Sequence, residues 1–93
     1  MSTAIDNRLD GAQRAARLRI VSDLSDSKGQ PIIEFCFELI AWILTGQKKP
    51  VGAPTDRVRS AVRAAINVGL RENYGSEDPA DVDQNVLSRR NSL

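Results

Sequence analysis

The chain has 93 residues, no histidine and one cysteine, and its 13 basic and 12 acidic residues leave a formal net charge of +1. This length fits one small domain, and a single cysteine excludes a disulfide within the chain. The tetrahedral nitrogen and sulfur ligands of a structural zinc site are missing, as is a histidine to act as general base. We therefore expect one small domain that binds no metal or cofactor and is not an enzyme.

The first predicted helix covers residues 8–24. Apolar side chains recur at spacings of three and four from Ile5 to Leu24, which places them on one helical face. Leu18 falls on the opposite face among arginines, so it is either exposed or a contact point. The sequence SDLSDSKG at 22–29 consists of turn-forming residues and ends this helix.

The second predicted helix covers residues 31–45. It begins at Pro31, since proline is favoured at the first helical position, where its missing N–H costs nothing. It ends before Gly46, which suits a left-handed C-cap, and the two lysines that follow suit the negative end of the helix dipole. Both ends of this helix are therefore marked in the sequence.

The apolar surface of this second helix is wide. Glu34 and Glu38 are the only polar residues at 32–44. They share one narrow stripe with Ala41 and Thr45, which leaves an apolar arc of about 220° at ~100° per residue. A surface helix normally turns a stripe of roughly 100° to the core, so two separate surfaces must cover this one. The run is also shorter than the ~20 residues of a membrane span, so no membrane insertion is expected.

The third predicted helix covers residues 55–74. It begins near Thr55, whose hydroxyl can accept hydrogen bonds from the free N–H groups of the first turn. Ala61, Ala65 and Gly69 recur every four residues along it. They form a ridge of small side chains that would let another helix approach closely.

Residues 76–93 form a polar, weakly periodic segment. We interpret it as a mobile tail, with a short helix after Pro79 as the alternative. Its sequence RRNSL matches a basophilic kinase site at Ser92, a short match that we attribute to chance. The predicted fold class is all-α, with a three-helix domain at 1–75 followed by the tail.

The wide apolar arc indicates that the second helix serves an interface as well as the core. The other two helices could cover one flank, and an uncovered flank rich in aromatic residues is typical of an interaction site. We assign the partner-binding surface to Ile32, Phe35, Glu38, Leu39, Trp42 and Ile43. We assign a dimer contact or the core to Ile33, Phe37, Ile40, Leu44, Ala61 and Ala65. The alternative is a buried central helix in a monomeric bundle.

Nucleic-acid binding is an alternative function, because residues 47–75 carry six basic and two acidic residues. Arg59, Arg63 and Asn67 share one face of the third helix, an array that can meet phosphates or a base edge. The loop before this helix has about nine residues. A helix-turn-helix joins its helices with a turn of about three or four residues. The sequence therefore favours protein binding over DNA binding.

In its size, its three predicted helices and its aromatic stretch PIIEFCFELIAWIL at 31–44, the chain resembles the small bacterial anti-activators that bind LuxR-type quorum-sensing receptors. The resemblance implies sequestration of a transcription regulator by occupation of its dimerisation surface. The stretch holds no signature motif, so no functional residue is carried over.

Self-association and a cytoplasmic location are also expected. A domain of this length has a marginal core, and self-association is a common remedy, so we expect a homodimer. The N-terminal sequence MSTAIDNR lacks the apolar segment of a signal peptide, and the lone thiol of Cys36 suits a reducing compartment.

Overall fold

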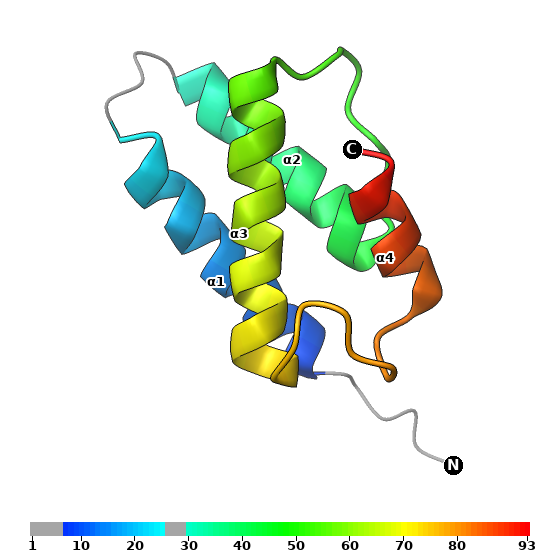
Figure 1. The fold of residues 1–93 in the computed structure, drawn as a ribbon. Coiled ribbons are helices and arrows are strands. Elements are labelled where there is room, and N and C mark those ends of the chain that lie inside the picture. The colour runs from blue at the N-terminus through cyan, green and yellow to red at the C-terminus, as the bar shows by residue number, and fades with distance from the viewer. Residues whose placement is uncertain (1–6, 26–29) are drawn as a thin grey trace.

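The computed structural model describes residues 7–25 and 30–93, and these residues form four α-helices without a β-strand (Figure 1). The helices are α1 (Asn7–Asp23), α2 (Gln30–Thr45), α3 (Asp56–Tyr74) and α4 (Gln84–Asn91). The all-α class is confirmed, whereas the number of helices is four rather than the predicted three. In Figure 1, α3 crosses in front of α1 and α2, and α4 lies beside the C-terminal half of α2.

The ends of α2 and α3 follow from local chemistry that the sequence displays. Gly46 has a φ of 75°, a left-handed conformation that favours glycine, and its N–H donates to the Trp42 carbonyl at 3.0 Å. At the start of α3, the Thr55 hydroxyl accepts a hydrogen bond from the Val58 N–H at 3.2 Å. This bond satisfies one of the free donors of the first turn. Both predicted caps are confirmed.

Helices α1 and α3 pack at very short range because small residues face each other. A Cβ atom added to Gly69 would lie 2.4 Å from the carbonyl oxygen of Ala12, so only glycine fits there. Ala12, Ala16 and Ala65 are each fully buried along the same contact. The ridge of small residues predicted on α3 therefore does bring another helix close, and that helix is α1.

Helix α4 covers part of α2 that the sequence pattern had left uncovered. Val82 and Val86 are 3% and 1% exposed, and Leu87 and Leu93 pack against the core from its edge. An eight-residue helix is too short to be stable alone, since isolated helices need ~12–15 residues. Burial of each valine contributes about 1.5 kcal/mol, so α4 depends on its contacts with the rest of the domain.

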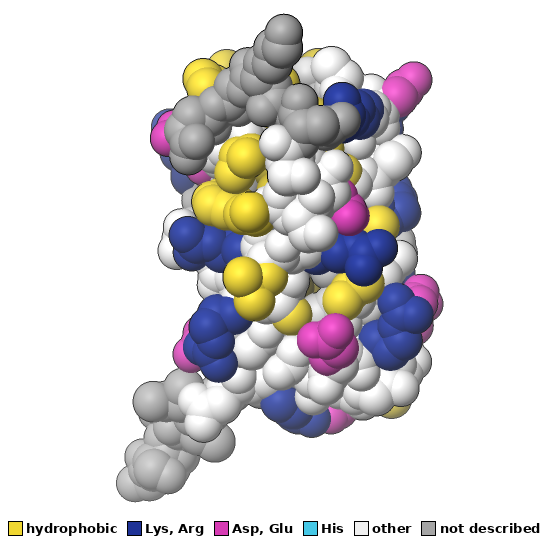
Figure 2. All heavy atoms as spheres, turned by 90° about the vertical axis from the view of Figure 1, so that its left-hand side faces the viewer, with side chains coloured by type: hydrophobic (Ala, Val, Ile, Leu, Met, Phe, Trp, Pro, Cys, Tyr) yellow, Lys and Arg dark blue, Asp and Glu magenta, His cyan; other side chains and the backbone are white. Residues whose placement is uncertain are grey.

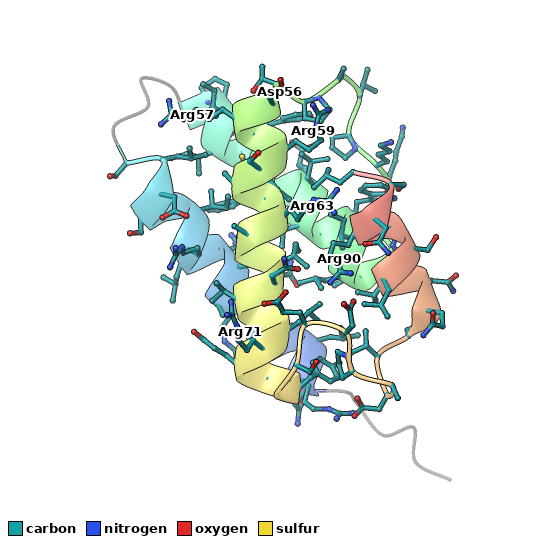
Figure 3. All side chains as sticks on the ribbon, in the orientation of Figure 1. Asp56, Arg57, Arg59, Arg63, Arg71 and Arg90 are labelled. Carbon is teal, nitrogen blue, oxygen red and sulfur yellow. The ribbon has the colours of Figure 1, made fainter. Side chains whose placement is uncertain are left out.

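A buried arginine fastens α4 to α3 and to the loop between them. Arg90 is 7% exposed, and Figure 3 shows it between α4 and α3. Its guanidinium donates to the Asn67 side-chain oxygen at 3.2 Å and to the Glu77 carbonyl at 2.9 Å. It also donates to the Asp78 carboxylate at 2.7 Å and to the Asn91 side-chain oxygen at 3.0 Å. The planar guanidinium therefore joins three segments of the chain at one point.

The neighbouring arginine has a different partner. The Nε of Arg89 donates to the carbonyl oxygen of Ile43 at 3.1 Å, in the last turn of α2. The last carbonyl groups of a helix lack partners inside the helix, and a positive charge is favourable there. The two arginines of RRNSL, which the sequence placed in a polar tail, are thus structural.

We expect Gly69→Ala to destabilise the protein. Helix propensity alone would raise the free energy of unfolding by about 1 kcal/mol, because alanine is the better helix former. The clash with the Ala12 carbonyl oxygen forces α1 and α3 apart, and overpacking of this kind costs about 1–3 kcal/mol. Urea denaturation measures the difference. The control is Ala64→Gly on the exposed side of α3, which reports helix propensity alone. A more stable Gly69→Ala protein would contradict the close contact.

We expect Arg90→Met to lower the free energy of unfolding by about 2–4 kcal/mol, because hydrogen bonds to a buried charge are lost together. Arg90→Lys should not restore it, since an ammonium group cannot match the guanidinium fork. Denaturation followed by circular dichroism gives both values. The matched control is Arg71→Met, because the Arg71–Glu77 pair at 3.6 Å is exposed and contributes under ~1 kcal/mol. Equal losses of stability in Arg90→Met and Arg71→Met would show that the buried Arg90 network contributes no more than an exposed ion pair.

Candidate protein-binding surface

The centre of the apolar arc of α2 is core. Five of its side chains are at most 1% exposed: Cys36, Leu39, Ile40, Ile43 and Leu44. The assignment of Leu39 and Ile43 to a partner-binding surface is therefore wrong. Both are covered because three helices, α1, α3 and α4, pack against α2, where the sequence pattern predicted two. Ile40 and Leu44, assigned to a dimer contact or the core, lie in the core.

One edge of the arc remains at the surface, and so does Ile32, which lies near the middle of the arc but in the first turn of α2. Ile32 is 41% exposed and Phe35 is half-buried. They border a shallow apolar pocket of about 290 Å³, which is lined by Pro31, Ile32, Phe35, Ala53, Thr55 and Val58. Ala53 and Thr55 make the loop at 46–55 the far wall of the pocket. A Cβ atom on Gly52 in the same loop would lie 4.0 Å from the Phe35 ring. Val51, next to that glycine, is 91% exposed.

The same edge continues along α2 to the tryptophan. Trp42 follows Phe35 by two helical turns and is half-buried. The ammonium group of Lys49 lies 4.7 Å from the centre of its ring, a cation–π contact that covers part of the aromatic face. Glu38 is exposed between the two turns. We call Ile32, Phe35, Glu38 and Trp42, with the pocket, the Phe35 surface.

The opposite edge of the arc faces α1. Ile33 and Phe37 are half-buried, and the guanidinium of Arg17 lies 4.5 Å from the centre of the Phe37 ring. Leu18 and Val21 on the outward side of α1 are 72% and 46% exposed. Figure 2 looks onto the α1 side of the molecule, where yellow apolar side chains lie in islands between blue Lys and Arg side chains. Leu18 is thus exposed, one of the two outcomes that the sequence left open.

The basic face of α3 is partly occupied by contacts within the domain. Arg59 pairs with Asp56 on the same helix, and the side-chain oxygen of Asn67 accepts from Arg90. In Figure 3, Arg59 and Arg63 point to the α4 side of α3, while Arg57 and Arg71 lie on the other side. The side-chain oxygen of Asn67 therefore already has a hydrogen-bond partner within the domain. Nucleic-acid binding stays a prediction.

Cys36 is buried in the core, and this burial raises the pKa of its thiol above the ordinary value of 9.0. The neutral thiol therefore persists in the folded protein at neutral pH, and it behaves as an apolar packing group. Across residues 7–25 and 30–93, no three side chains with metal-ligating groups lie together. No helix in this part of the chain combines the length and hydropathy of a membrane span.

Comparison of the chain with protein-family models, curated proteins and solved structures gives no match.

The thiol of Cys36 should give the protein a measurable loss of stability at high pH. Its pKa is higher folded than unfolded, so its contribution is fully present below the ordinary value of 9.0 and is lost as the pH rises through the folded pKa. Urea denaturation between about pH 7 and about pH 10 should show a steeper decline for the wild type than for Cys36→Ala. Parallel pH profiles would contradict a raised pKa.

Proposed function

We propose that this chain is a non-enzymatic regulatory protein that binds another protein through the Phe35 surface. The pocket at the start of α2 carries this proposal. It is concave, its lining is almost entirely apolar, and the exposed Ile32 borders it. Apolar surface of this kind on a small domain is typical of a binding site. Half-buried aromatic side chains such as Phe35 and Trp42 are common anchors of such sites.

The mode of binding that suits this surface is the insertion of an apolar side chain from a partner helix. The pocket is wide enough for one side chain, and the edge of α2 extends from it for two turns to Trp42. Lys49 and Glu38 bring opposite charges to the same edge. Charges at the rim of an interface set the orientation of the partner more than the affinity.

Within this proposal, the partner is a transcription regulator of the LuxR type, sequestered at its dimerisation surface in the cytoplasm of a bacterium. The support is the resemblance of the aromatic stretch at 31–44 to quorum-sensing anti-activators, together with the position of Phe35 and Trp42 at the surface of that stretch. We also propose that the chain is a homodimer. DNA binding has less support, because Asn67 already bonds to Arg90.

We expect Ile32→Asp to weaken partner binding by about tenfold or more, because it places a charge at the mouth of an apolar pocket. The fold should survive, since Ile32 is exposed and an aspartate in the first turn of a helix suits the helix dipole. The measurement is the amount of a co-expressed LuxR-type receptor that is retained when the tagged chain is purified. Leu18→Asp on α1 is the matched control.

Three results of this experiment bear on separate parts of the proposal. Retention by the wild type and Leu18→Asp, with loss in Ile32→Asp, supports both the surface and the partner class. Equal retention by all three proteins would exclude the Phe35 surface. No retention by the wild type would exclude this class of partner.

A further inference from the structure

The edge of α2 that faces α1 carries a charge pattern of its own. Phe37 lies at its centre, with Ile33 one turn before it. On the α1 side of Phe37 are Arg14 and Arg17, and the latter covers the phenylalanine ring. On the other side is Glu34, which is exposed on α2 about 60° around the helix from Phe37. An apolar centre is thus bordered by a basic edge and an acidic edge.

Among residues 7–25 and 30–93, Arg14, Arg17 and Glu34 have no ion-pair partner. Arg19, on another side of α1, does pair with Asp23 at 2.9 Å. Among the arginines of α1, the two beside Phe37 are therefore the ones without an ion-pair partner, while neither acid of α2 forms an ion pair within the described residues.

The basic edge is also hollowed. Arg14, Arg17 and Leu18 line a depression of about 240 Å³. Leu18 is 72% exposed, so apolar area is present beside the two guanidinium groups. Asp10 is the one carboxylate on the same outward side of α1 within the described residues. A segment that fits this depression therefore needs an apolar side chain and a negative charge.

We infer that a second copy of this chain docks here, through a two-fold contact centred on Phe37. In a two-fold dimer the same surface is used by both copies, so each edge of one copy meets the other edge of its partner. A surface with Arg17 at one border and Glu34 at the other is complementary to itself under this rotation. Each copy would supply an apolar centre and two ion pairs would form, one at each end.

This inference rests on the homodimer in the proposed function, and it assigns the dimer contact to the edge of α2 opposite the Phe35 surface. Partner binding and self-association then use separate edges of one helix. Glu38 lies nearer to Phe35 and Trp42 than to Phe37 around the helix, so it belongs to the Phe35 surface and is left unchanged in the test.

The test is a charge exchange between the two edges. Sedimentation velocity over a range of concentrations measures self-association of the wild type, Arg17→Glu, Glu34→Arg and the double variant. Each single reversal places like charges opposite each other at both ends of the contact, so the dissociation constant should rise by about tenfold or more. The double variant restores opposite charges and should dimerise again. An equimolar mixture of the two single variants should form a heterodimer.

The control is Arg19→Glu, which makes the same charge change on another side of α1 and should dimerise like the wild type. Circular dichroism establishes that each variant keeps its helices. A wild type that stays monomeric at every concentration overturns the inference, as do single variants that dimerise like the wild type. A double variant no better than either single variant excludes the pairing of these two edges.

The same proteins separate this inference from the proposed function. Ile32→Asp leaves the Phe37 edge unchanged, so it should dimerise normally while it loses the receptor. Arg17→Glu leaves the Phe35 surface unchanged, so it should retain the receptor as a monomer. If the dimerisation results contradict the Phe37 contact, the receptor results still test the Phe35 surface, and the reverse also holds.

Discussion

The apolar circumference of α2 is the constraint around which this domain is built. Its apolar arc spans about 220°, roughly twice what one neighbouring layer covers. Helices α1 and α3 cannot spread to enclose it, because their own contact is fixed at close range by Gly69 against Ala12. The third helix that covers α2 is α4, which has eight residues and is held by Arg90 rather than by a large apolar face. The stability of the core thus depends on a polar contact at its edge.

The sequence predicted the features that arise from local chemistry. Periodicity located three helices, and the caps at Gly46 and Thr55 were visible because each acts within one turn. It predicted a short helix after Pro79 only as the alternative to a mobile tail, because only two valines of that segment are buried and its main anchor joins positions far apart in the chain. The misplacement of Leu39 and Ile43 has the same origin, since the cover over α2 was counted without α4.

The angular position of a residue on α2 predicted its environment only at the edges of the arc. Phe35 and Trp42 on one edge and Phe37 on the other are half-buried, and two of these rings lie beneath a cation from another segment. Such contacts contribute about 0.5–1 kcal/mol at exposed sites, too little to fix the fold. Lys49 and Arg17 instead give the two edges different surroundings, which no helical wheel of α2 could show.

The placement of these two edges bears on the proposed binding of a partner protein. A dimer that used the Phe35 surface would have to dissociate before it could bind another protein there. The free energy of dimerisation would then lower the apparent affinity for the partner. In the proposed dimer the copies join at Phe37, so the pocket between α2 and the loop at 46–55 would stay open on each copy. Each copy would then hold one regulator chain at its dimerisation surface, and one dimer would sequester two regulator chains.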